Sequence, residues 1–318
     1  MALPAIDPES RLLALIASAE PRLQNALLNA VTATKKSLTL DTLMRLIESG
    51  KFEEAVEIAV RAGSIRLADE TAAVYTQAGQ EGSKFLTDVL EVTVGFDQVN
   101  DRAVRIIQQD RLRLIREFSA EQRRATRAAL TDGIRRGLNP IDQARNFRGS
   151  IGLTARQQLA VERYRTLLQE GSTEALERTL RDRRFDSTVR SAVRRGVPLT
   201  NKQVKQMTGR YSERLLAHRA KVIGRTEALR AVHAGNDEAY RQAIDDGVLN
   251  VDQLRRTWIT ARDERVRGSH RGLNGLTRGM DETFPGLGGP LRFPGDPAAP
   301  ASETVQCRCA LTTRIGTP

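Results

Sequence analysis

Apolar residues recur at helical spacing through most of this 318-residue chain, and the spacing changes only after Gly247. The stretches 52–62 and 212–246 place apolar side chains three or four positions apart, which predicts amphipathic helices. Residues 256–261 instead alternate polar and apolar side chains, the pattern of a half-buried strand. The sequence therefore predicts an α+β fold. Mostly helical N-terminal and middle regions precede a small C-terminal module of a helix and an antiparallel sheet.

Composition agrees with a helical core and narrows the class of protein. Aromatic residues make up 4% of the chain and hydrophobic residues 40%, so the core must consist mainly of Leu, Ile, Val and Ala. The sequence has no run of about 18 apolar residues and no signal-peptide pattern, which predicts a cytoplasm-like compartment and no membrane partner. The two cysteines stand too close together for a disulfide framework.

Local start and stop signals divide the helical part of the chain. Asp41 is the expected N-cap of a helix that ends at Gly50, and Ser119 with Gln122 predicts a capping box at the start of a new helix. Further helix starts are expected at Asn139-Pro140, Thr154, Ser172, Thr200 and Ser212, and interruptions at Pro8, Pro21, Gly63, Gly79 and Gly82. We expect three consecutive domains: residues 1–97, a helical region; 98–200, an Arg-rich helical bundle; and 201–318, the C-terminal module.

The net charge of +11 is unevenly distributed. Residues 1–100 carry a net charge of −5, whereas residues 101–200 carry 22 basic side chains, all arginine, and a net charge of +10. Arginine can bind phosphate or carboxylate through two hydrogen bonds at once. Two interpretations remain open: a solvated helical surface, and a surface that contacts double-stranded DNA or an acidic protein ring. The candidates for DNA contact are Arg123, Arg124, Arg135 and Arg136.

Side chains capable of chemistry gather between Trp258 and Cys309. His270, Cys307 and Cys309 are zinc-type ligands, and Asp263 could be a fourth. We expect a strand over residues 305–313, in which side chains at positions i and i+2 point the same way. The cluster is then either a metal site or a reduced cysteine pair in a small core, with His270 bonded to a loop. A catalytic zinc with Glu264 as base is a further alternative.

Other features of this window favour a structural role. Asp263, Arg265 and Arg267 form an alternating charged run, which predicts a salt-bridge network that fixes the loops. The turn Leu273-Asn274-Gly275-Leu276 is expected to be of the hairpin type I′. Glu227, within a largely apolar helix, is expected to form an ion pair. The sequence contains no Gly-rich phosphate loop, no His-Glu-x-x-His motif and no Ser-centred nucleophile elbow.

The ordered set of motifs in this part of the chain resembles the phage head morphogenesis family, the phage Mu F-like minor head proteins. The resemblance covers roughly residues 210–315 and rests on the following motifs, read in order. They are Arg225-Thr226-Glu227, Trp258, Asp263, Arg267, His270, Gly275, Pro294-Gly295-Asp296-Pro297 and Cys307-Arg308-Cys309.

The resemblance implies a minor capsid protein of a tailed phage that acts in head morphogenesis. It would be made in the host cytoplasm and kept in the virion, inside the procapsid. Its partners would be the portal protein, the major capsid or scaffold proteins and, during DNA packaging or ejection, DNA. The resemblance does not imply an enzyme. The alternatives are a metal-dependent hydrolase or nucleic-acid-processing enzyme, centred on Asp263, His270, Cys307 and Cys309, and a free-standing nucleic-acid-binding protein.

Overall fold

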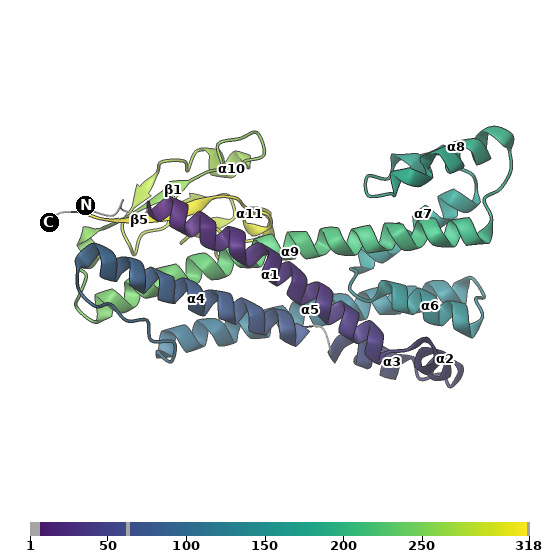
Figure 1. Cartoon of the computed structure of the whole chain (residues 1–318), viewed down its shortest axis with the longest axis horizontal. Helices are drawn as coiled ribbons and strands as arrows, with labels where there is room; N and C mark the ends of the chain where they lie inside the picture. Colours follow the sequence, from purple (N-terminus) through teal and green to yellow (C-terminus); the bar gives the residue numbers. More distant parts are fainter. Residues whose placement is uncertain (1–6, 62–63, 317–318) are drawn as a thin grey trace. The chain divides into compact units, whose positions relative to one another are not determined.

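The computed structural model describes residues 7–61 and 64–316, and helices account for most of them (Figure 1). The α-helices are α1 (Pro8–Ser37), α2 (Leu40–Glu48), α3 (Phe52–Arg61), α4 (Ser64–Leu90), α5 (Asp101–Arg135), α6 (Pro140–Ser150), α7 (Ala155–Gln169), α8 (Asp186–Arg195), α9 (Asn201–Asp245), α10 (Gly268–Arg271) and α11 (Ala301–Thr304). Short 3-10 helices are η1 (Thr173–Glu177), η2 (Arg183–Phe185) and η3 (Val251–Gln253). The expected interruption at Gly63 lies outside the described residues. No described helix is long and apolar enough to cross a membrane.

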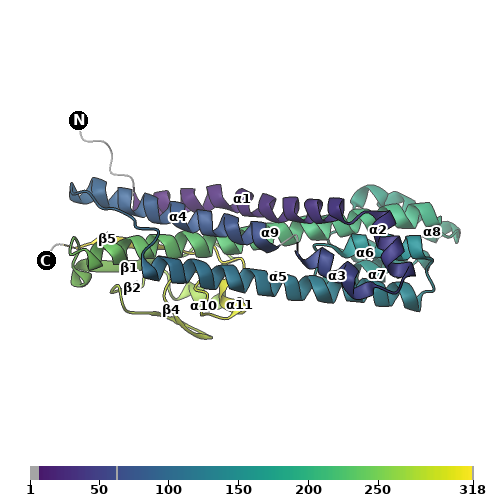
Figure 2. The ribbon, with the colours of Figure 1, turned by 90° about the horizontal axis from the view of Figure 1, so that it is seen from below.

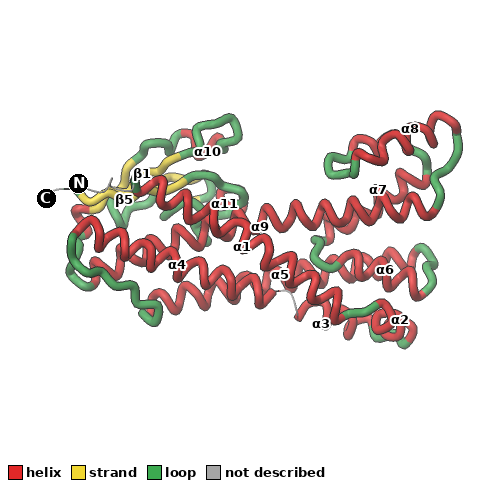
Figure 3. Tube along the Cα trace, viewed as in Figure 1, coloured by secondary structure: helices red, strands yellow, loops and turns green. Residues whose placement is uncertain are grey.

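Strands occur only after α9 in the described chain (Figure 3). They are β1 (Leu254–Ile259), β2 (Thr277–Arg278), β3 (Phe284–Gly286), β4 (Gly289–Leu291) and β5 (Ala310–Ile315). One antiparallel sheet has the order β2-β1-β5, with Trp258 opposite Leu311, and β3 pairs with β4 in a separate hairpin. The fold is therefore α+β with a C-terminal antiparallel sheet, as the change of periodicity predicted.

Packing divides the chain into two compact units that are not consecutive in sequence. Unit 1 comprises residues 1–26, 67–112 and 221–318, and unit 2 comprises residues 27–66 and 113–220. Helices α1, α4, α5 and α9 each contribute residues to both units. The expected boundaries at 97/98 and 200/201 do not coincide with this division. The expected boundaries divide the chain into consecutive segments. The observed units are not consecutive, because single long helices contribute residues to both of them.

In unit 1, helices α1 and α4 lie side by side (Figure 2), joined by Arg22 of α1 and Glu70 of α4 at 2.8 Å. The expected interruption of α4 at Gly79 and Gly82 is wrong, because the helix runs through both residues. A Cβ atom at Gly82 would lie 2.9 Å from the Cβ of Ala239. These glycines therefore allow close approach of neighbouring segments instead of ending the helix.

A core cluster of unit 1 joins α4 and α9 to the sheet. Leu86 of α4, Tyr240 of α9, Leu254 of β1 and Met280 belong to one cluster of buried side chains. Their exposed fractions are all at or below 2%. The C-terminal sheet is thus packed on helices that come from distant parts of the sequence.

In unit 2, α5 is continuous, so the expected new helix at Ser119 is wrong. Gln122 is buried, and its side-chain oxygen accepts a hydrogen bond from Gly152 N at 2.7 Å instead of capping a helix. The expected caps at Asn139 and Thr154 are confirmed, the latter as a complete capping box with Gln157. These two caps involve neighbouring residues, whereas the partner of Gln122 is distant in sequence.

Four further boundaries differ from expectation. Thr39 and not Asp41 caps α2, because its hydroxyl accepts from Thr42 N. Pro21 lies inside α1 without ending it. Ser172 opens only the short helix η1. The helix capped by Thr200 continues through the expected start at Ser212 and forms the single helix α9.

Candidate functional site

Helix α9 carries the tripeptide Arg225-Thr226-Glu227, and each of its side chains holds a different neighbour. Arg225 forms an ion pair with Glu20 of α1 at 3.1 Å. The Thr226 hydroxyl accepts from the backbone N–H of Gln306 at 3.1 Å, which ties the segment before β5 to the helix. Glu227 pairs with Arg230 at 3.1 Å, so the ion pair expected for it is confirmed. Thr226 thus ties the C-terminal module to α9, and Arg225 ties α9 to α1.

The segment Pro294–Pro297 lies against the same helix. The carbonyl of Gly295 accepts from Arg230 Nε at 3.1 Å. Gly295 has a φ of +85°, and a Cβ there would lie 3.3 Å from the Arg230 backbone, so the position favours glycine in both respects. Asp296 is buried and accepts hydrogen bonds from the backbone and side chain of Arg292. Burial alone would raise the pKa of Asp296, but these bonds outweigh it and lower the pKa. Pro294 is buried and Pro297 is exposed.

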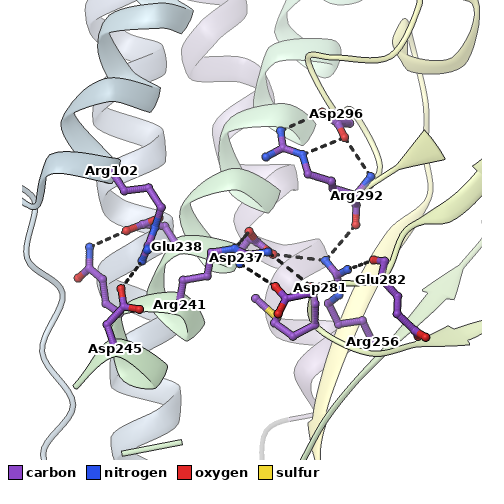
Figure 4. Close-up of polar contacts among 12 residues, drawn as sticks. Arg102, Asp237, Glu238, Arg241, Asp245, Arg256, Asp281, Glu282, Arg292 and Asp296 are labelled. Atoms are coloured by element: carbon purple, nitrogen blue, oxygen red, sulfur yellow. Dashed lines mark hydrogen bonds and ion pairs between the residues drawn. The ribbon is translucent and has the colours of Figure 1, made fainter. Parts of the chain in front are cut away.

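A buried arginine that sequence reasoning did not single out connects this segment to the sheet (Figure 4). Arg256 of β1 is 1% exposed and donates to the carbonyls of Gly279, Arg292 and Glu282. It also contacts Asp237 of α9 at 3.4 Å. Burial lowers the pKa of Arg256, although the Asp237 carboxylate opposes that shift. The signal available in the sequence was register, since Arg256 stands two residues from both Leu254 and Trp258 and so shares their inward face.

The structure brings His270, Cys307 and Cys309 together. Their ligand atoms all lie within 4.8 Å of one another, and all three residues are buried. His270 is on the short helix α10, and the cysteines lie between α11 and β5. The expected strand over 305–313 is wrong in its first half, because Gln306 takes a φ of 57° and the strand begins only at Ala310. A bend, and not strand alternation, therefore places both sulfurs beside His270.

Two buried groups surround this cluster, and neither was singled out as its neighbour from the sequence. Glu303 of α11 is 4% exposed, and its carboxylate lies 2.9 Å from His270 Nε2. Trp258 is fully buried, with its ring 5.4 Å from the His270 ring in an edge-on arrangement. The indole nitrogen of Trp258 is buried and has no hydrogen-bond partner among the described residues. The single tryptophan thus packs directly against the cluster.

The electrostatics of the cluster are coupled. A hydrogen bond from Cys309, together with one from His270, lowers the pKa of the Cys307 thiol despite burial. The same Cys307–Cys309 contact raises the pKa of Cys309. Burial opposes the charged form of His270, but Cys307 and Glu303 outweigh it and raise its pKa.

The remaining motif residues hold the loops around the cluster. Asp263 receives two hydrogen bonds from Arg308, so its carboxylate lies in an ion pair, outside the group formed by His270 and the cysteines. The hydrogen bonding from Arg308 is the main cause that lowers the pKa of Asp263. Arg267 donates to the carbonyl of Val305. Asp263 does form an ion pair, but with Arg308 and not with Arg265 or Arg267, so the network expected within the charged run differs from the one that forms. Arg265 and Glu264, a weak pair at 3.9 Å, have mostly exposed side chains.

The turn at residues 273–276 also differs from expectation. Leu276 N donates to Leu273 O at 2.9 Å, which closes a β-turn. Gly275 has a φ of 81°, but Asn274 does not take a positive φ, whereas a type I′ turn requires one at both central residues. Asn274 uses its side-chain oxygen to accept from Thr260 N at 3.0 Å. The turn therefore braces the end of β1 within the long connection to β2.

The four arginines suggested for DNA contact lie on α5 in unit 2. Arg123 forms an ion pair with Glu57 of α3, Arg124 with Glu121, and Arg136 with Asp132. Arg135 is exposed. Much of the arginine charge at these positions is therefore already balanced by carboxylates in the same unit.

Comparison with known proteins bears on the C-terminal part of the chain. Residues 171–312 match the family described as "Phage Mu protein F like protein". This C-terminal part of the chain is therefore similar to the phage head morphogenesis family. The matched residues contain every motif of the Mu F-like module described above, from Arg225 to Cys309.

A curated relative of this chain is the "Minor head protein GP7" of Bacillus phage SPP1, which is 34% identical over 110 residues. The alignment covers 34% of this chain and 33% of the relative, so the chain spans about a third of the relative's length. No solved structure matches the chain at a significant level.

Proposed function

We propose that this protein is a minor head protein of a tailed phage that acts in head morphogenesis, associated with the portal inside the procapsid. The observation that carries the proposal is the family match over residues 171–312, supported by the minor head protein with which the chain shares 34% identity. Its partners in this role would be the portal protein and the major capsid or scaffold proteins. It would be found in the virion.

A structural role is also supported by how the motif residues are used. Asp263 is engaged by Arg308, Glu227 by Arg230 and Asp296 by Arg292. These three motif carboxylates are thus each held in an ion pair that fixes a loop or a helix. Glu264, the other candidate base, has a side chain that is 85% exposed. These contacts support a docking module more than a hydrolase.

DNA contact during packaging or ejection is the less supported part of the proposal. The net charge of +10 in residues 101–200 favours it. The ion pairs of Arg123, Arg124 and Arg136 reduce the charge that phosphates would meet on α5. We therefore place protein partners first and retain DNA as a second, weaker contact.

The test is incorporation into particles. A phage carrying a tagged copy of the gene would be grown, and procapsids and mature heads would be separated and probed for the protein. We expect the protein in immature heads and in complexes captured with the portal. Its absence from particles at every assembly stage would contradict the proposal.

Trp258→Ala provides a matched variant for the same experiment. Truncating a fully buried tryptophan costs about 3–5 kcal/mol, which should unfold the C-terminal module and abolish incorporation. Arg265→Ala, which removes a side chain that is 79% exposed, should leave both folding and incorporation intact. If Trp258→Ala stayed folded but failed to enter heads, that residue would act by direct contact and not through stability.

A further inference from the structure

The distances among His270, Cys307 and Cys309 suit a tetrahedral metal ion. Zn–S bonds of about 2.3 Å and Zn–N bonds of about 2.0–2.1 Å, at a tetrahedral angle, place ligand nitrogen and sulfur atoms about 3.6 Å apart. His270 Nδ1 lies 3.6 Å from Cys307 Sγ and 3.5 Å from Cys309 Sγ. A single ring nitrogen directs one lone pair or one N–H and can bond well to only one sulfur. Two sulfurs at the same distance fit a shared metal better than hydrogen bonding.

Glu303 orients His270 for this role. Its carboxylate lies 2.9 Å from His270 Nε2, so Nε2 carries a proton, and Nδ1 faces the sulfurs, where it can offer its lone pair to a metal. Metal-binding histidines commonly have such a carboxylate on the other nitrogen, where it fixes the tautomer and raises the ligand's basicity. Ser269 also donates to the same carboxylate, which restricts its position. Glu303 is therefore a positioning residue and not a ligand.

A fourth ligand position adjoins the three side chains. A cavity of about 10 Å³ is lined by His270, Cys307 and Cys309 together with Arg267 and Gln306, among others. That volume is about what one water molecule needs. Asp263 cannot be the fourth ligand in this conformation, because both of its oxygens accept hydrogen bonds from Arg308. A water molecule fits the position that the protein leaves open.

Trp258 supplies an independent observation. Its indole N–H is fully buried and lacks a hydrogen-bond partner among the described residues, which is costly in a protein core. The indole lies beside the thiol of Cys309. A metal-bound thiolate on Cys309 would give this N–H the acceptor that it otherwise lacks.

From these observations we propose that His270, Cys307 and Cys309 bind one zinc ion, with water as the fourth ligand and Glu303 orienting His270. Two thiolates balance the charge of Zn²⁺, and each thiol that is protonated releases its proton to solvent as the metal binds. The ion would link α10 to the bend before β5, and so cross-link two loops of the C-terminal module beside Trp258. The site does not depend on the proposed role in head assembly, because metal binding is measured on the purified chain.

The experiment is metal analysis of the full chain purified under reducing conditions, followed by replacement of zinc with Co²⁺. We expect one zinc per chain and, with Co²⁺, the near-ultraviolet absorption of thiolate-to-cobalt charge transfer. Cys307→Ser and Cys309→Ser should each weaken that absorption. Glu303→Gln should lower zinc affinity by about 10- to 100-fold while preserving the absorption of the saturated site.

Asp263→Asn is the matched control, because it changes a nearby carboxylate that the proposal places outside the metal's ligands. It should bind zinc with unchanged stoichiometry and nearly unchanged affinity. Absence of bound metal after zinc is added to the reduced, folded wild-type chain would overturn the proposal. So would zinc binding that is the same in the wild type and in the double variant Cys307→Ser, Cys309→Ser. If Asp263→Asn were the only variant that lost the metal, Asp263 would be a ligand and the ligand set proposed here would be wrong.

Discussion

His233 of α9 is buried where the helix meets strand β5, and its surroundings require a neutral ring. Nδ1 donates to the carbonyl of Leu229 at 2.8 Å, and Nε2 accepts from the backbone N–H of Leu311 at 3.1 Å. The ring stacks on Phe293, with 6.2 Å between centroids. A second proton on Nε2 would point at the N–H of Leu311 and break the link to β5. Protonation should therefore be strongly disfavoured in the folded chain.

The size of the effect follows from the pKa. Burial lowers the pKa of His233 from 6.5 to about 4. As pH falls below about 6.5, the unfolded chain takes up a proton that the folded chain excludes, so stability is lost between about pH 6.5 and pH 4. At about 1.4 kcal/mol per pKa unit, the full loss is about 3 kcal/mol. The pKa of His270 is shifted in the opposite direction, so its contribution is present at low pH and lost as pH rises.

The measurement is urea unfolding at a series of pH values from 7 to 4, monitored through the fluorescence of Trp258. Because this is the single tryptophan and lies in unit 1, the signal reports on the unit that contains His233. His233→Gln removes the titrating group, so its stability should fall less steeply with acid than that of the wild type. The difference in free energy of unfolding between the wild type and His233→Gln should change by about 3 kcal/mol from pH 7 to pH 4.

His218→Gln is the control, since His218 is exposed on the same helix and should track the wild type throughout. Titration of His270 and of the carboxylates is common to all three proteins and cancels in the differences. A gap between wild type and His233→Gln that stays constant from pH 7 to pH 4 would refute the reasoning.

Two further predictions concern arginines. Arg256→Leu should destabilise unit 1 by about 3–5 kcal/mol, because it removes the buried donor of three carbonyls and leaves Asp237 with Arg241 as its remaining ion-pair partner. Arg255→Leu, on the exposed face of the same strand, should cost about 0.5 kcal/mol or less; equal losses in urea unfolding would contradict this. Weak, non-specific DNA binding by the chain should fall steeply with salt and decrease when Arg123, Arg124, Arg135 and Arg136 become Ala. A salt-independent gel-shift or anisotropy signal would count against that contact.

Local signals in the sequence determined much of the secondary structure. The caps at Asn139, Thr154 and Thr200 were found because the side chain and the N–H that it accepts from lie within three residues. The change of periodicity after Gly247 located the sheet module for a similar reason, since one buried face repeats every second residue in a strand. Such patterns need no knowledge of distant segments.

Only the tertiary structure decided what the remaining polar side chains and glycines do. Gln122 resembles a capping residue but bonds Gly152, and Gly82 resembles a helix breaker but allows Ala239 to approach. Sequence reasoning grouped His270 with the two cysteines, because their ligand types and spacing are visible in the chain. It did not find Glu303, 33 residues away, as the partner of His270. A carboxylate is identified as a metal's orienting group only by the nitrogen that it faces, and folding alone brings the two together.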